Sequence, residues 1–365
     1  MVLGFVDASR RFRARCLVGA AIALAAMFAA LPSAPAQDYP SRPVKIIVPF
    51  PAGGTADVMP RIFAEWLSRK WGQPVIVENR TGAAGMVGAN SLFNAAKPDG
   101  LTIGFMVGIT TQGLIGGESI KFDPAKFRWL GALPQTQVLL ARNDLKLATP
   151  RDLLKPARPL VLANTGSTST TGMGNRLFLN MIGATYQHVT GFPGQAESIL
   201  ALARGEVSLD NGGLIAYLAR REAIRQEGLY DAILQRGELN PDGTFRRNRL
   251  IPEIPTMPEA ITELNPAALN STDFAAYRSI VGAFAVQFGL VLPPGAADAT
   301  VRMLSKAVGE GLNDPQLRQE VQDKLKTDYD FADGPTAERL VARLRSEFDA
   351  DPRIGALINH LMTSR

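Results

Sequence analysis

The sequence predicts an α/β protein of two lobes, joined by two crossover segments into a hinged clam-shell. Apolar runs alternate with helical periodicity from Val44 to Val107, in the order strand, helix, strand, helix, strand, which is typical of a parallel sheet. A second series of the same kind begins at Leu160. Two further apolar passages, 128–140 and 279–292, are interpreted as the crossovers. We therefore expect one lobe to comprise residues 37–138 and 284–365, and the other to comprise residues 139–283.

The first 36 residues have the features of a secretory signal peptide. Four arginines between residues 10 and 15 precede an apolar stretch, 17–31, that is shorter than a typical membrane-spanning helix. Ala34-Pro35-Ala36 then offers small residues for cleavage, so we expect a mature chain that begins at Gln37. The alternative is an uncleaved anchor.

Composition excludes several classes of function for the mature chain. Setting aside the four arginines and Asp7 of the leader leaves 35 Lys and Arg residues against 33 Asp and Glu residues. A net charge this small argues against a nucleic-acid-binding protein. The one cysteine, Cys16, also lies in the leader, which excludes disulfides, thiolate metal sites and cysteine nucleophiles from the mature protein.

The first predicted loop is a candidate anion site. The strand around 44–48 ends in a proline- and glycine-rich segment that includes Gly53 and Gly54, and helical periodicity follows at once. We expect Asp57 to be the N-cap and Pro60 to be the third helical residue, which leaves the loop amides for a ligand. The alternative, supported equally by spacing alone, is a tight strand-to-helix turn without a ligand.

The other elements of the first lobe place further loops at the same edge of the sheet. We expect strands at 74–77 and 101–107 and a helix at 87–96, with loops at 78–85 and 108–113. Because the carboxyl ends of parallel strands meet at one edge, these loops can line one crevice.

In the second lobe, loops follow strands in the same way. Strands are predicted at 160–163, 186–189 and 207–210, with a hydroxyl-rich loop at 164–171 and a glycine loop at 190–194. Residues 225–255 are polar and are interpreted as a solvated excursion that carries the arginines 246, 247 and 249, the alternative being a binding role for these arginines. Three helices, near 297–312, 315–327 and 335–350, are expected to complete the chain.

Groups for catalysis are scarce in this sequence. The two histidines, His188 and His360, have no metal-ligand spacing, and a histidine within a strand is more often structural. No serine or threonine has a nearby histidine to activate it. We therefore expect binding rather than catalysis, with no catalytic residue, no metal and no cofactor.

Three blocks of sequence resemble the Bug-type receptors, the extracytoplasmic solute-binding proteins of tripartite tricarboxylate transporters. They are residues 39–57, YPSRPVKIIVPFPAGGTAD, residues 72–80, GQPVIVENR, with the glycines that follow, and residues 98–102, PDGLT. The resemblance covers essentially the whole mature chain. The second lobe departs from the family pattern, with Thr168 in place of a glycine, Ser208 in place of an aspartate, and a longer 225–255 excursion.

The resemblance implies a fold, a function and a set of contacts. The fold would be a type II-like periplasmic-binding-protein clam-shell, located in the periplasm and acting as a monomer. It would capture a small carboxylate compound and deliver it to membrane permease subunits, without an enzymatic step and without nucleic acid. The ligand-binding residues implied are Phe50, Ala52, Gly53, Gly54, Thr55, Asp57, Thr110, Gly166, Ser167, Thr168, Ser169, Phe192, Gly194 and Asp210. Two alternatives remain open, an exported hydrolase-like α/β enzyme that acts on an anionic substrate and a receptor that feeds a sensor.

Overall fold

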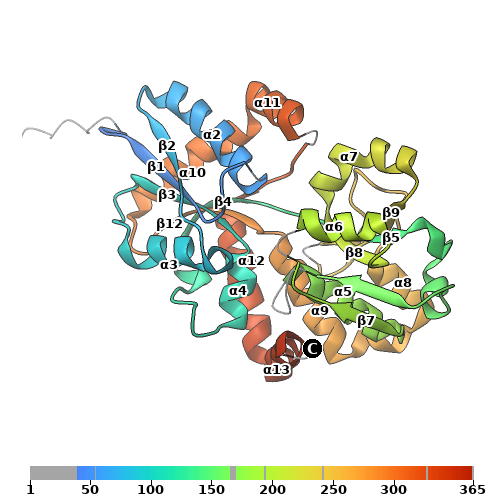
Figure 1. The fold of residues 1–365 in the computed structure, drawn as a ribbon. Helices are drawn as coiled ribbons and strands as arrows, with labels where there is room; N and C mark the ends of the chain where they lie inside the picture. Colours follow the sequence, from blue (N-terminus) through green and yellow to red (C-terminus); the bar gives the residue numbers. More distant parts are fainter. Residues whose placement is uncertain are drawn as a thin grey trace, which may run out of the picture. The chain divides into compact units, whose positions relative to one another are not determined.

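Two β-sheets, each with its own helices, organise the fold (Figure 1). The structure is a computed structural model that describes residues 39–53, 55–164, 170–192, 195–240, 242–325 and 328–363. All named elements lie within the compact unit Arg42–Arg365, and the predicted signal peptide lies outside the described residues. The predicted architecture of two α/β lobes is confirmed.

The first sheet has six strands in the order β13-β4-β12-β3-β1-β2. Strands β1, β2 and β3 are parallel, whereas β12 runs antiparallel to β3 and β4. Its strands are β1 Val44–Val48, β2 Val75–Asn79, β3 Thr102–Val107, β4 Arg128–Leu133, β12 Phe288–Leu292 and β13 Ala332–Asp333. The helices that accompany these strands along the chain are α2 Thr55–Trp71, α3 Met86–Ala95, α4 Ile109–Ile115, α10 Asp298–Asn313, α11 Pro315–Leu325 and α12 Gly334–Ala350.

The second sheet has five strands in the order β7-β6-β8-β5-β9. Strand β6 is parallel to β7 and β8, and β5 is antiparallel to β8 and β9. Its strands are β5 Gln137–Arg142, β6 Leu160–Ala163, β7 Tyr186–Val189, β8 Leu209–Gly213 and β9 Tyr230–Gln235. The helices of this part of the chain are α5 Thr170–Ile182, α6 Gln195–Arg204, α7 Leu214–Glu227, α8 Met257–Leu264 and α9 Thr272–Phe284.

The chain passes between the sheets twice, through shorter links than the sequence suggested. The passage 128–140 contains β4 of one sheet and most of β5 of the other, with only residues 134–136 between them. The passage 279–292 contains the end of α9 and all of β12. The two links meet where the Gln135 N–H donates to the Phe284 carbonyl at 2.9 Å. Both passages are apolar because they are strands and helix buried in the lobes.

Two predictions for the rest of the chain were wrong. The 225–255 excursion is not solvated throughout, since it contains β9 and a small hairpin of β10 Glu238–Leu239 and β11 Phe245–Arg246. After α12 a further helix, α13 Pro352–Thr363, packs against α9 and α5. Its apolar side chains, Ile354, Ile358 and Leu361, join the core of the second sheet. Local periodicity at the end of a chain does not reveal such a distant partner.

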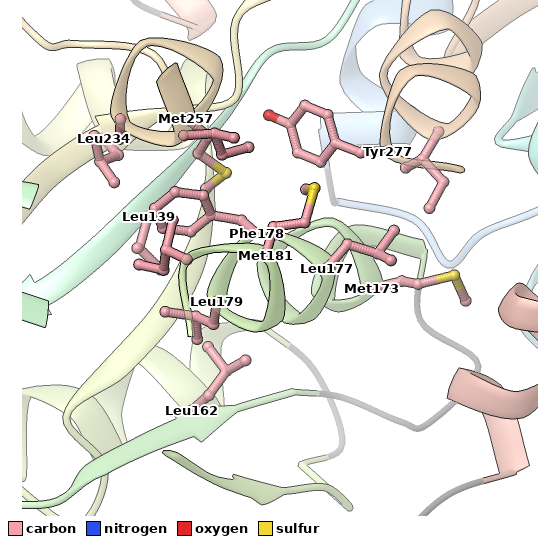
Figure 2. Packing of buried hydrophobic residues seen from close by; sticks show 14 of the residues in the cluster. Leu139, Leu162, Met173, Leu177, Phe178, Leu179, Met181, Leu234, Met257 and Tyr277 are labelled. Atoms are coloured by element: carbon pink, nitrogen blue, oxygen red, sulfur yellow. The ribbon is translucent and has the colours of Figure 1, made fainter. Parts of the chain in front are cut away.

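The core of the second lobe is built around α5 (Figure 2). Leu177, Phe178 and Leu179 are fully buried and pack with side chains of the sheet and of α8 and α9. Burying each such side chain contributes about 1.5–3 kcal/mol, so this core holds α5 firmly against the sheet. The first sheet has a separate core that includes Ile47, Leu92 and Met106.

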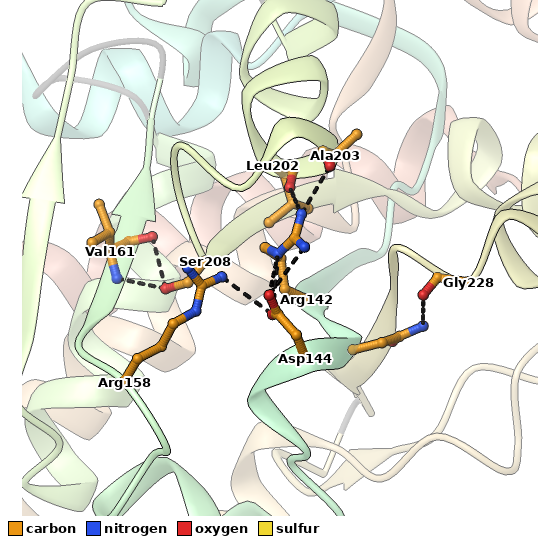
Figure 3. A network of polar contacts seen from close by, with 9 residues as sticks. Arg142, Asp144, Arg158, Val161, Leu202, Ala203, Ser208 and Gly228 are labelled. Carbon is orange, nitrogen blue, oxygen red and sulfur yellow. Dashed lines mark hydrogen bonds and ion pairs between the residues drawn. The ribbon is translucent and has the colours of Figure 1, made fainter.

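A polar network secures the end of α6 and the neighbouring strands (Figure 3). Arg142 donates to the carbonyls of Leu202 and Ala203, at 3.0 and 2.8 Å, and pairs with Asp144. Ser208 accepts a hydrogen bond from the Val161 N–H at 2.6 Å. Ser208, which departs from the family pattern, therefore binds the backbone of β6.

Candidate functional site

The loop between β1 and α2 is fixed by a network centred on Asp57. The Asp57 carboxylate is 2 % exposed and accepts hydrogen bonds from the Gly53 N–H at 2.9 Å and from Asn79 Nδ2 at 2.8 Å. Arg61 donates to both carboxylate oxygens, at 2.8 and 2.9 Å. Asn79 also donates to the Phe50 carbonyl at 2.8 Å, so the network joins the loop to both β2 and α2.

This geometry corrects the predicted start of the helix. Helix α2 begins at Thr55, so Asp57 lies inside the first turn and is not the N-cap. Pro60 is then the sixth helical residue rather than the third. The Gly53 N–H is engaged by Asp57 and is not available to a ligand, contrary to our expectation. Gly53 has a φ of 93°, which favours glycine at this position.

The Asp57 carboxylate is held in its charged form. Burial works to raise its pKa, but the hydrogen bonds from Arg61, Asn79 and Gly53 outweigh burial and lower the pKa to about 2. Arg61 balances this charge directly. The loop therefore carries no net negative charge that would cancel the partial positive charge at the N-terminal end of α2.

The other predicted residues of this loop lie beside the network. Phe50 is half-buried, with its ring against the backbone of Gly85, where an added Cβ would lie 3.3 Å from the ring. Ala52 is exposed, and Thr55 is the first residue of α2. Gly54 lies outside the described residues.

Thr110 brings a buried hydroxyl to the end of β3. It lies in the first turn of α4, is 1 % exposed, and its Oγ1 has no hydrogen-bond partner among the described residues. Nearby, the Gly108 N–H donates to the Gln287 carbonyl at 2.9 Å. A buried polar atom is normally satisfied, so this hydroxyl is suited to a water or a ligand.

Replacing Thr110 by valine tests whether this hydroxyl serves a ligand. The change keeps the shape of the side chain and removes the hydroxyl, so the stability of the ligand-free protein should stay the same or rise. If a ligand uses the hydroxyl, its affinity should fall by about 1 kcal/mol, roughly fivefold. Thermal unfolding and calorimetry with adipate measure the two effects. Lower stability without any change in affinity would give Thr110 a purely structural role.

In the second lobe the structure describes only part of the predicted site. Gly166, Ser167, Thr168, Ser169 and Gly194 lie outside the described residues. The two residues that are described are Phe192, which packs partly buried on a hydrophobic cluster, and Asp210, which is 1 % exposed in β8. Burial raises the pKa of Asp210 to about 7, while its Oδ1 accepts from the Asn211 N–H at 2.8 Å.

The predicted residues are therefore brought together only in part. Phe50, Gly53 and Asp57 share one network, and among the described residues no hydrogen bond joins this network to Thr110 or Asp210. Sequence reasoning missed Arg61 and Asn79 as members. The i,i+4 spacing of Asp57 and Arg61 is a signal that could have revealed Arg61.

A cavity of about 180 Å³ lies away from this network, at the links between the sheets, beside Gln135, Arg236 and Phe284.

The described part of the chain offers no cluster of side chains typical of a metal site. No cluster of three His, Cys, Asp or Glu residues there could hold a metal ion. His188 is partly buried in β7, where burial and the nearby Arg176 lower its pKa to about 4. No helix within the described ranges is long and apolar enough to cross a membrane.

Solved structures share this fold. A TctC solute-binding protein from Polaromonas superposes with a TM-score of 0.65 at 22% identity, covering 88% of this chain and 99% of that one. A Rhodopseudomonas palustris protein with adipate gives 0.63 at 22% identity, with coverages of 88% and 99%. MatC of the same species, with bound malate, gives 0.60 at 20% identity, with coverages of 86% and 99%.

Sequence relatives and a family match identify the group. A UPF0065 protein of Bordetella pertussis is 29% identical over 78% of this chain and 81% of its own. BugT of the same species is 28% identical over 76% of this chain and 78% of its own. Residues 59–342 match the TctC family, described as the tripartite tricarboxylate transporter family receptor. The chain therefore belongs to the tripartite tricarboxylate transporter family of receptors.

Proposed function

We propose that this receptor is exported to the periplasm, binds a small carboxylate compound between its two lobes, and delivers it to the membrane permease subunits of a tripartite transporter. Family membership supports a receptor role. The structural relatives with adipate and malate support a carboxylate as the ligand. We further propose that the protein acts as a monomer and does not alter its ligand chemically.

The observation that carries this proposal is the Asp57 network. It holds the backbone of the loop at 50–53 at the N-terminal end of α2, a helix of 17 residues. Backbone amides and the positive end of a helix favour an anion at such a place. Since Arg61 balances the charge of Asp57, the loop does not repel a carboxylate.

We propose a ligand site formed by loops of both lobes. The first lobe would contribute its loop at 50–57 and Thr110, and the second lobe would contribute the other residues. The proposed contacts are Phe50, Ala52, Gly54, Thr55, Thr110, Gly166, Ser167, Thr168, Ser169, Phe192, Gly194 and Asp210, with Gly53 and Asp57 supporting the loop.

The first test is to identify the ligand that the protein carries. Freshly purified protein is denatured and the released compounds are analysed by mass spectrometry, and we expect a small carboxylate in near-stoichiometric amount. Calorimetry with adipate and malate follows, with the uncharged dimethyl ester of adipate as the control. Because the proposed site recognises anionic oxygens, an acid should bind and the ester should not.

Two results would contradict the proposal. Equal binding of adipate and its dimethyl ester would show that charge is not recognised. Conversion of a bound acid to a new product during incubation would instead favour the enzyme alternative.

A further inference from the structure

The 225–255 excursion extends from the second sheet towards residues 328–330, which precede β13 of the first sheet. Within it, Arg249 forms an ion pair with Asp328 at 2.8 Å, and a second, longer one with Asp330 at 3.7 Å. A small cavity beside this contact is lined by Asn248, Arg249 and Leu250 from one side and by residues 328–330 from the other. The ion pair therefore connects the two lobes.

On the side of the second lobe, Arg249 is held in place by its neighbours. The preceding residue, Asn248, donates its N–H to Gln235 Oε1 at 2.7 Å. Gln235 is fully buried at the end of β9 and also donates to the carbonyls of Ile251 and Ile254, at 3.0 and 2.7 Å. The backbone on both sides of Arg249 is thus anchored to the second sheet.

On the side of the first lobe, the Asp328 side chain itself is held. Arg318 of α11 donates to Asp328 Oδ1 at 2.7 Å, and the Tyr329 N–H donates to the same oxygen at 2.8 Å. Arg318 also lies over the Tyr329 ring, at 4.6 Å from its centroid, and the Tyr329 hydroxyl donates to the Leu312 carbonyl at 3.1 Å.

Exposed ion pairs usually contribute little, because two long side chains must be ordered to form them. Here the Asp328 side chain is already ordered within its own lobe and the backbone on both sides of Arg249 is anchored, so less entropy is lost when they meet. Arg249 is 52% exposed and Asp328 is 41% exposed, so the pair remains open to screening by salt.

We propose that Arg249 is a clamp residue that holds the two lobes together, and that the long excursion serves to carry it. In the ligand-bound receptor the clamp would slow the separation of the lobes and so the release of the ligand. The effect on ligand release rests on the proposed function, whereas the contact that holds the lobes together does not.

The test measures the distance between the lobes without any ligand. Spin labels are attached to cysteines introduced at Met303 in α10 and at Leu229 before β9, both of which are exposed. Cys16, the single native cysteine, is replaced by serine in the full chain. Pulsed electron spin resonance then compares the parent with Arg249→Gln.

Arg247→Gln is the matched control. Arg247 lies two residues away in the same segment, but its ion pair with Glu259, at 2.9 Å, stays within the second lobe. We expect Arg249→Gln to broaden the distance distribution towards longer values and Arg247→Gln to leave it unchanged. Raising NaCl from about 0.05 M to about 1 M should shift the parent towards the Arg249→Gln distribution, because salt screens exposed charges.

A double-mutant cycle assigns the effect to the pair. Asp328→Asn also disturbs Arg318, so the effect of this variant alone does not isolate the pair. The coupling between Arg249 and Asp328 is therefore calculated from Arg249→Gln, Asp328→Asn and the double variant. The double variant should open little further than Asp328→Asn alone, since only the longer contact to Asp330 is then lost. Identical distributions for Arg249→Gln and the parent would overturn the clamp, as would an equal change in Arg247→Gln.

The dissociation rate of a bound ligand gives an independent test of the clamp. With adipate as the probe, Arg249→Gln should dissociate roughly two- to fivefold faster than the parent, with an unchanged melting temperature in the ligand-free form. An unchanged dissociation rate together with a broadened label distance would overturn the role in release and leave the clamp intact. If adipate and the other acids do not bind at all, the proposed function fails, while the label experiment still decides the clamp.

Discussion

Replacing Asp57 by asparagine should lower the free energy of unfolding at pH 7 by about 2 kcal/mol and should greatly weaken carboxylate binding. The native carboxylate accepts from Gly53, from Asn79 and twice from Arg61. An amide carries two donors of its own, so it cannot accept all of these bonds, and hydrogen bonds to charged groups are worth about 1.5–3 kcal/mol. Once these bonds are lost, the loop at 50–53 is no longer held at the end of α2.

The same effect should depend on pH in a defined direction. The pKa of Asp57 is about 2 in the folded protein, below its ordinary value of 3.8. A lowered folded pKa stabilises the protein above the unfolded pKa, and this contribution is lost as pH falls through the folded value. The stability difference between parent and Asp57→Asn should therefore be constant above about pH 5 and should shrink between about pH 4 and pH 2.

Chemical denaturation at several pH values, together with calorimetry, measures both effects. Asp298→Asn is the control, because Asp298 also lies in a first helical turn and pairs with Arg128 at 2.8 Å, but is 72% exposed. We expect the control to change stability little. An Asp57→Asn variant with the parent's stability would refute the role of the network. A destabilised variant that binds adipate as tightly as the parent would show that the ligand site does not include this loop.

Replacing Gly172 by alanine should lower the free energy of unfolding by about 1–3 kcal/mol, in the range for overpacked cores. A Cβ at Gly172 would lie 1.6 Å from the side-chain amide nitrogen of Asn164, which is 1 % exposed. Asn164 follows β6 and precedes the proposed ligand residues 166–169, and its N–H donates to the Val189 carbonyl at 2.9 Å. The added methyl group would displace Asn164, so we expect the affinity for a carboxylate to fall as well.

Gly309→Ala is the matched control for this change. Gly309 lies within α10, and a Cβ there would meet no atom within 4 Å. Since alanine favours the helix more than glycine does, this variant should gain up to about 1 kcal/mol. Thermal unfolding of both variants checks the prediction. If Gly172→Ala were as stable as Gly309→Ala, Asn164 would have room to move and the packing argument would fail.

Elements whose signals are local could be predicted from the sequence. The strands β6 and β7 occur at the predicted residues, Leu160–Ala163 and Tyr186–Val189, and α3, α10 and α11 lie within two residues of their predicted bounds. Apolar periodicity and turn residues act over a few positions, so they reveal where such an element begins and ends. The same signals placed the loops at the carboxyl ends of parallel strands, and hence the candidate site.

Contacts between distant parts of the chain could not be predicted in this way and follow from the fold. An acidic residue soon after a glycine loop is compatible with an N-cap, but the carboxylate of Asp57 is held by Asn79, which comes from the next strand. The apolar run 128–140 divides between two sheets because β4 pairs with β12 and β5 pairs with β8. Helix α13 is buried on α9 and α5, and Arg249 meets Asp328 across 79 residues of chain. Each of these outcomes depends on a partner distant in sequence, and the free energy of such a contact is not encoded in the residues on one side of it alone.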